Sequence, residues 1–121
     1  MAKQIDGNVG NFTAGGTIAQ YARVNLTAAG VVGVADGTAN SVGVARVAAV
    51  LNDVIGVEFH SKAGTQKMIA AAAIGVGETV YAATAGKVTT TAGTLKIGMA
   101  LDAAAADGDL IEVLPSPDWV A

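Results

Sequence analysis

Few residues of this sequence could carry out catalysis, and the first to consider is its one histidine. The chain has no cysteine, which excludes disulfides, thiolate metal sites and cysteine nucleophiles together. His60, an aspartate and a serine could form a catalytic triad, but no G-x-S-x-G motif places a serine on a strained turn. We therefore interpret His60 as a polar residue at a strand end and predict no catalytic role for the three serines, Ser41, Ser61 and Ser116.

A second candidate is the acidic segment DAAAADGD. Asp102, Asp107 and Asp109 could offer oxygen ligands to Ca²⁺, but four alanines occupy the interval where an EF-hand loop needs alternating ligands. The glycine-rich segments 7–16 and 30–37 lack the order of a phosphate-binding loop. The sequence therefore predicts an acidic turn, no metal site, no cofactor and no enzymatic activity.

The charge of the chain argues against nucleic-acid binding. Seven basic and ten acidic residues give a formal net charge of −3, and the basic residues are scattered along the sequence. A protein that binds phosphate backbones needs clustered lysine and arginine. The longest apolar run, residues 68–77, is about half the roughly 20 residues needed to span a bilayer. We expect neither a nucleic-acid partner nor a membrane segment.

The apolar residues predict a thin core. They make up 52% of the chain, but 26 of them are alanine and only five are aromatic. Apolar burial stabilises by roughly 25 cal/mol per Å², and a methyl group offers little area. A lone copy should be marginally stable, so we expect self-association or docking on a larger surface to stabilise it.

Short runs of Val, Ile and Thr, separated by glycine about every ten residues, predict antiparallel β-structure. Alanine-rich segments at 46–53, 70–73 and 103–106 could compete as helices, but each is too short to be stable alone. The fold class is therefore all-β, a small β-barrel or β-sandwich with at most one or two helical turns. We predict strands at residues 23–27, 31–35, 42–48, 54–59, 67–71, 78–83, 87–91, 96–101 and 110–114.

An internal repeat supports this prediction. Residues 23–45 resemble residues 79–100 with one residue deleted, and Val24 aligns with Val80. Gly43 likewise aligns with Gly98. Each copy predicts the same three-stranded unit, in which a turn containing Ala-Gly joins the first two strands.

The chain divides into an extended N-terminal arm (1–20), a single β domain (21–115) and a C-terminal tail (116–121). The arm is rich in Gly and Asn with isolated large apolar residues, so we expect it to order against a partner. Prolines 115 and 117 hold the tail extended, and its tryptophan is either packed on the domain or inserted into a neighbour. The predicted capsid or subunit contacts are Ile5, Val9, Phe12, Ile18 and Trp119.

Residues 74–115 resemble the C-terminal half of phage capsid cement or head-decoration proteins. The shared order is Gly-acidic, Val-Tyr, Gly-Lys-Val-Thr, Ile-Gly-hydrophobic-Ala, an acidic turn and a closing strand. The arm is longer and richer in Asn and Gly than the family suggests, which leaves the grip on the capsid open. The matching residues are Gly77, Glu78, Val80, Tyr81, Gly86, Lys87, Val88, Thr89, Ile97, Gly98, Met99, Ala100, Asp102 to Asp109 and Ile111 to Leu114.

This resemblance implies a structural virion protein that is made in the host cytoplasm and binds the outside of a phage head. It would bind the major capsid protein at capsid-protein junctions, often as a homotrimer, and stabilise the shell. One alternative is a tail, spike or fibre module of a phage particle. Another is a carbohydrate-binding β-domain that would use Tyr21 or Tyr81, although five scattered aromatic residues offer little for such a site.

Overall fold

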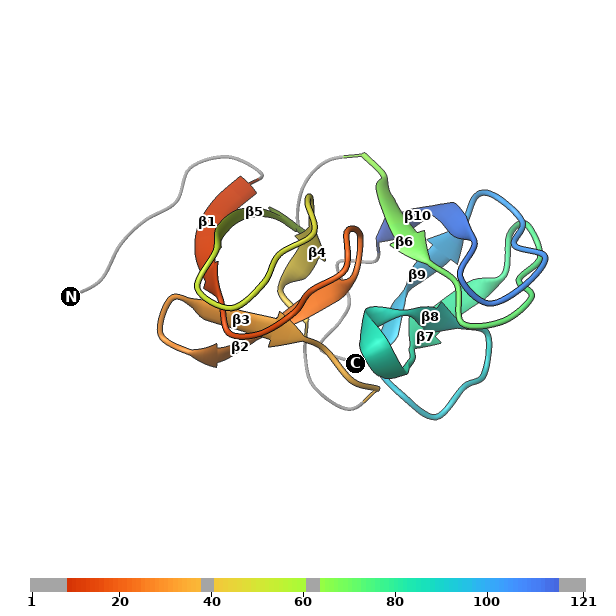
Figure 1. The fold of residues 1–121 in the computed structure, drawn as a ribbon. Coiled ribbons are helices and arrows are strands. Elements are labelled where there is room, and N and C mark those ends of the chain that lie inside the picture. Colours follow the sequence, from red (N-terminus) through yellow and green to blue (C-terminus); the bar gives the residue numbers. More distant parts are fainter. Residues whose placement is uncertain (1–8, 38–40, 61–63, 116–121) are drawn as a thin grey trace.

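The computed structural model describes residues 9–37, 41–60 and 64–115, and these form two five-stranded halves that lie side by side (Figure 1). The halves are called the first repeat and the second repeat below. One 3-10 turn, η1 (Thr84–Gly86), is the only helical element in these ranges. The strands of the first repeat are β1 (Val9–Ala14), β2 (Arg23–Ala28), β3 (Val31–Val34), β4 (Gly43–Ala45) and β5 (Val54–Phe59).

The strands of the second repeat are β6 (Gln66–Ile69), β7 (Thr79–Ala82), β8 (Val88–Thr89), β9 (Lys96–Ala100) and β10 (Leu110–Pro115). The first repeat is a closed barrel in the order β1-β3-β2-β4-β5, and a parallel pairing of β1 with β3 helps to close it. The second repeat is a sheet in the order β6-β10-β9-β7-β8. A parallel bridge between Ala70 and Val88 brings its two edge strands together, as in the first repeat.

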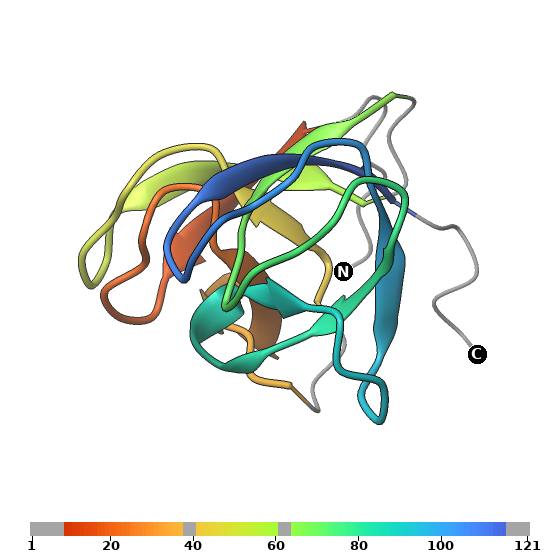
Figure 2. The ribbon, with the colours of Figure 1, turned by 90° about the vertical axis from the view of Figure 1, so that its right-hand side faces the viewer.

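All nine strands predicted from the sequence are present, and the all-β fold class is confirmed. The alanine-rich segments 46–53, 70–73 and 103–106 are not helical. Their alanines lie in turns and in isolated bridges, where Ala49 pairs with Ile18 and Ala104 pairs with Ile74. Figure 2 shows the loops 15–22, 46–53 and 101–109 on one side of the molecule.

The strand pairings follow the same order in both halves, over all ten strands. Val24 pairs with Gly43 in the first repeat, and Val80 pairs with Gly98 in the second. The repeat also relates β1 to β6 and β5 to β10, which lie outside the two segments compared in the sequence. Phe12 pairs with Ile55 just as Met68 pairs with Ile111. The chain is therefore a tandem duplication of one five-stranded unit.

The prediction of an arm over residues 1–20 is wrong from Val9 onward. Strand β1 pairs antiparallel with β5 over five residues and parallel with β3, so it is one of the strands of the barrel. Ile18 is buried in the core of the first repeat. The segment was mistaken for an arm because glycine and asparagine interrupt its apolar residues, while its strand pairing is long-range. Residues 1–8 lie outside the described ranges.

Each repeat has its own small core. The first is built around Val24, Val32 and Val57, and the second around Met68, Val80 and Ile111. Val44 belongs to the first repeat but packs in the second core, so the two cores meet at β4. The described part of the chain therefore holds two small cores, one in each repeat.

Two equivalent glycines allow neighbouring strands to come close. A Cβ atom added at Gly43 would clash with the carbonyl oxygen of Glu58, and one added at Gly98 would clash with that of Leu114. In both repeats the closing strand, β5 or β10, pairs with the strand that carries this glycine. The glycine is therefore required by the repeated strand pairing.

We predict that Gly43→Ala and Gly98→Ala each lower the free energy of unfolding by roughly 1–3 kcal/mol or more, because the backbone must shift to admit a methyl group. Chemical denaturation of the purified variants would measure this. Gly16→Ala is the matched control, since a Cβ there meets nothing within 4 Å. Equal stabilities for all three variants would contradict the prediction.

Candidate functional site

The structure brings His60 and Ser41 together, but in a buried structural chain. His60 Nε2 lies 2.8 Å from Ser41 Oγ, and His60 Nδ1 lies 2.8 Å from Gln66 Oε1. Gln66 Nε2 donates to the carbonyl oxygens of Glu58 and Phe59, so its Oε1 accepts the Nδ1 proton and Ser41 donates to Nε2. The third member is a neutral amide, which cannot support an imidazolium as an aspartate would. The interpretation of His60 as a polar residue after a strand is confirmed, with the addition that it is buried.

Arg23 is the centre of this buried chain and joins the two repeats. Its side chain is fully buried on β2 of the first repeat. Its Nη2 donates to the carbonyl oxygen of Ala83 at 2.7 Å, and its Nε donates to that of Lys87 at 3.0 Å. Both acceptors flank η1 of the second repeat. Nη1 lies 3.4 Å from Ser41 Oγ, which links the guanidinium to His60.

Burial lowers the pKa of both basic groups. Desolvation lowers the pKa of Arg23 to about 10, while the nearby Asp36 acts in the opposite direction. The pKa of His60 is also lowered by burial, and the charge of Arg23 adds to this. The hydrogen bond to Gln66 only partly opposes these effects. His60 is therefore neutral at pH 7 and Arg23 is charged.

The acidic residues of the 102–109 segment have structural roles. Asp109 Oδ2 accepts hydrogen bonds from the backbone N–H groups of Ala105 and Ala106. Asp107 forms an ion pair with Lys87 at 2.7 Å. No group of three or more metal-ligating side chains occurs within residues 9–37, 41–60 and 64–115. The predicted acidic turn is thus confirmed, and Asp53 holds the equivalent turn of the first repeat by accepting from Val50 N–H.

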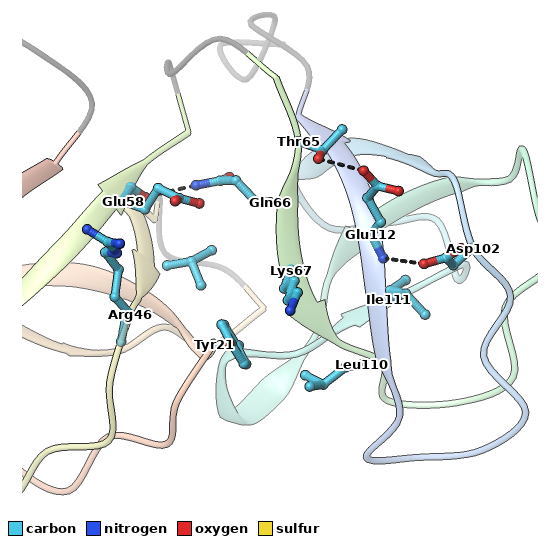
Figure 3. Close-up of a pocket in the computed structure, with 12 residues that line it drawn as sticks. Tyr21, Arg46, Glu58, Thr65, Gln66, Lys67, Asp102, Leu110, Ile111 and Glu112 are labelled. Carbon is cyan, nitrogen blue, oxygen red and sulfur yellow. Dashed lines mark hydrogen bonds between the residues drawn. The ribbon is translucent and has the colours of Figure 1, made fainter.

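A groove of about 650 Å³ lies between the repeats (Figure 3). The first repeat lines it with Tyr21, Arg46 and Glu58, and the second with Lys67, Asp102 and Glu112 among others. Lys67 Nζ lies 5.7 Å from the centre of the Tyr21 ring. Within the described part of the chain, the one ion pair joins Lys87 to Asp107, so no ion pair crosses the groove. Asp102 accepts a hydrogen bond from Glu112 N–H, and the Glu112 carboxylate accepts one from Thr65. The groove is a hydrated seam between the repeats.

Tyr21 holds a strained backbone conformation beside this groove. Its φ of 68° lies in the left-handed region, where the second repeat has Gly77 with a φ of 84°. Side chains are disfavoured there, so a structural reason must keep the tyrosine. Its ring packs against the core of the second repeat. Tyr21 therefore helps to hold the two repeats together.

The five predicted contact residues lie in different environments or outside the described ranges. Ile18 lies inside the barrel, so its assignment as a contact residue is wrong: no partner can reach it in the folded chain. Val9 and Phe12 on β1 are half-buried, and Phe12 packs edge to face on Phe59. Ile5 and Trp119 fall outside the described ranges. A contact role for these other four residues stays a prediction.

Sequence reasoning missed the apolar side chains that the fold leaves exposed. The signal was available in part, because some of them align through the repeat with a charged residue, as Leu101 does with Arg46 and Leu114 with Glu58. The described part of the chain has no helix long and apolar enough to cross a membrane. The exposed large apolar residues are Leu26, Val47, Val50, Leu51, Val54, Val76, Met99, Leu101, Leu110 and Leu114.

We predict that Arg23→Met destabilises the protein by about 1–3 kcal/mol, because the carbonyl oxygen of Ala83 loses its donor, whereas that of Lys87 still accepts from the N–H of Ala83. Urea denaturation followed by circular dichroism would measure the change. Arg46→Met is the matched control, because the Arg46 side chain is exposed and its loss should cost within about 0.5 kcal/mol. Similar losses in both variants would show that Arg23 does not join the repeats energetically.

We also predict that acid destabilises the protein through His60. Its pKa in the folded state lies below the ordinary value of 6.5, so the unfolded chain binds more protons. The stabilisation is fully present above about pH 6.5 and is lost as the pH falls through the folded-state pKa. Unfolding free energies measured between pH 7.5 and 5.5 should therefore decrease.

The control for this prediction is His60→Gln, which removes the only histidine of the chain. Its unfolding free energy should vary less over the same pH interval, whatever its absolute stability. If the two pH profiles are parallel, a group other than His60 causes the dependence.

Two comparisons bear on the identity of the chain. The family model described as phage cement protein matches residues 6–115. Among solved structures, the base of the head fibre protein gp8.5 of bacteriophage phi29 is similar, with a TM-score of 0.69 and 19% identity over 89% of this chain and 92% of that one. No curated protein matches. At this identity the structural likeness shows the fold, whereas the family match spans most of the chain.

The resemblance found in the sequence is thereby confirmed. The family is one of structural proteins, as expected for a chain without a recognisable catalytic motif. The chain belongs to the phage cement proteins, the decoration proteins of the phage head, and its place is on the capsid of the virion.

Proposed function

We propose that this cement protein binds the major capsid protein at the junctions between capsid subunits, as a homotrimer, and so reinforces the shell from outside. The observation that supports this most is the set of large apolar side chains that the fold leaves exposed. Extended apolar surface on a soluble protein usually marks a protein interface. The role is structural and involves no catalysis.

The thin cores support a protein that depends on its partners. Alanine and valine make up most of both buried clusters, and each repeat has to fold around few side chains. Docking on a capsid buries further apolar area, and binding stabilises the folded chain by mass action. Binding then stabilises both the cement subunit and the capsid, because the same contacts also connect neighbouring capsid proteins.

The loop 46–53 is the proposed capsid-contacting surface among the described residues. Val50 and Leu51 are exposed at its turn. The equivalent turn of the second repeat carries Ala106 and Asp107, and Asp107 is paired with Lys87. Since both turns have the same backbone hydrogen bonds, the turn itself does not require large apolar residues. Ile5 and Trp119 at the chain ends are proposed to add to this contact.

Other partners fit less well. The formal net charge of −3 disfavours binding to packaged DNA. A fibre or tail module remains an alternative, since the phi29 head fibre base shares this fold. A carbohydrate site is disfavoured because Tyr21 lines the charged groove and Tyr81 lies on β7, a strand of the second repeat.

We predict that the purified protein co-sediments with expanded phage capsids at a fixed ratio, and that Val50→Gln with Leu51→Gln weakens this binding at least about tenfold by exposing amide groups to an apolar contact. Titration of capsids followed by sedimentation would measure both. Decorated capsids should also withstand higher temperature than bare ones.

The matched control carries Ala105→Gln and Ala106→Gln in the equivalent loop of the second repeat and should bind as the wild type does. A chain that begins at Val9 tests Ile5 separately, since it keeps every strand of the barrel. Absence of binding by the wild-type protein to bare expanded capsids would refute the proposed function.

A further inference from the structure

The two repeats pack on each other through different faces. The first repeat uses the side that carries Tyr21, Arg23 and Val44, called the A face below. The second repeat uses the side formed by β6 and η1, called the B face. Each repeat has an equivalent of both faces, because the two are copies of one unit. The A face of the second repeat and the B face of the first therefore have no partner among residues 9–37, 41–60 and 64–115.

The free A face of the second repeat is apolar where the used one is charged. Met99 occupies the position of Val44, as their pairings with Thr79 and Arg23 show. Leu101 and Leu114 stand where the first repeat has Arg46 and Glu58, two residues of the charged groove. The three side chains are 40%, 37% and 42% exposed, and Met99 pairs with Leu114 across β9 and β10.

The free B face of the first repeat is apolar both at Val54, where its used counterpart is apolar too, and at Val47, where the counterpart is charged. Val54 aligns with Leu110, and Val47 aligns with Asp102, both of which line the groove. Val54 is 71% exposed and Val47 is 49% exposed. This face includes β1, which lies at the end of the molecule remote from the second repeat (Figure 1).

A pair of equivalent glycines shows that this B face lacks a cover. Gly86 of η1 is buried, and a Cβ there would press on Ala22 and Arg23 of the first repeat. Gly30 has nearly the same φ, 73° against 72°, but it is exposed and a Cβ there would meet nothing within 4 Å. The turn at Gly86 thus packs against the A face of the first repeat, whereas the equivalent turn at Gly30 is exposed to solvent.

We propose that copies of this chain associate head to tail, with the A face of the second repeat of one copy packed on the B face of the first repeat of the next. The contact would use the counterparts of the faces that already pack within the chain, with Thr79 in place of Arg23 and Gly77 in place of Tyr21. This inference rests on the proposed function, because it names the surfaces through which the proposed homotrimer would form. Because the two faces differ, the interface is heterologous and must close into a ring to give a finite assembly.

The apolar replacements fit this occupant. Inside the chain, the joint leaves a hydrated groove lined by Arg46, Glu58, Lys67, Asp102 and Glu112. At the free faces, the equivalents of Arg46 and Glu58 are leucines and the equivalent of Asp102 is valine, so apolar residues would meet apolar residues. Such a contact excludes water from positions that the internal joint leaves wet, and it buries side chains that are otherwise exposed.

The test uses the full chain without capsids. We expect light scattering of the wild type to give a mass that is a small multiple of 11.8 kDa at micromolar concentration. Met99→Glu with Leu114→Glu alters the A face, and Val47→Glu with Val54→Glu alters the B face. Each double variant alone should be a monomer, with a dissociation constant raised by about 100-fold or more, because its charges would be buried without partners.

Mixing the two variants separates head-to-tail contact from any other arrangement. One variant keeps an intact A face and the other an intact B face, so the mixture should form a dimer with a single joint. A wild-type protein that stays monomeric, or a mixture that stays monomeric while both variants unfold at wild-type urea concentrations, would overturn the proposal.

The control with Val50→Gln and Leu51→Gln should keep the wild-type mass, since the equivalent residues Ala106 and Asp107 lie outside the groove. Loss of capsid binding with unchanged mass would affect only the capsid contact. A monomeric wild type that still co-sediments with capsids would refute the head-to-tail contact and the homotrimer, and would leave the proposed capsid contact in place.

Discussion

The guanidinium of Arg23 is the interaction on which the arrangement of the two repeats depends. It crosses from β2 of the first repeat to the carbonyl oxygens on either side of η1 in the second. A buried charge is expensive unless hydrogen bonds satisfy it, and here one of these bonds also satisfies the carbonyl oxygen of Ala83, while that of Lys87 accepts from Ala83 N–H as well. His60 and Gln66 extend the chain of hydrogen bonds to β6. The polar contacts therefore fix the orientation of two units whose small cores, among the described residues, meet around Val44 and Tyr21.

The duplication explains why such a polar joint is needed. Each unit of five strands has a core made largely of alanine and valine, too thin to be stable by a wide margin. Joining two units buries Val44 and the Tyr21 ring against the second core at the expense of a strained φ at Tyr21. The equivalent residue of the second repeat is Gly77, which adopts a positive φ without strain because it has no side chain. The second unit is thus free to use its own A face elsewhere.

The sequence predicted what depends on local pattern and missed what depends on contacts between distant residues. All nine strands with runs of Val, Ile and Thr were found, and the alignment of Gly43 with Gly98 predicted a repeat whose register the structure repeats. Strand β1 was missed because Gly10 and Asn11 break its pattern, while its pairing partner β5 lies more than forty residues away. The network of Arg23, His60 and Gln66 spans three separate strand regions, and no spacing in the sequence reveals it.

The contact between repeats is charged within a chain and apolar at the faces proposed to join two chains, and the difference follows from whether the two repeats are covalently connected. Within a chain, the second repeat is tethered to the first, so the effective concentration is high and a modest, partly hydrated contact is sufficient. Between chains, the same geometry must also offset the loss of translational and rotational freedom. Replacing Arg46 and Glu58 by Leu101 and Leu114 removes desolvation costs and adds apolar area where that additional free energy is required. A duplicated unit can in this way keep one packing geometry and use it twice, once wet within the subunit and once dry between subunits.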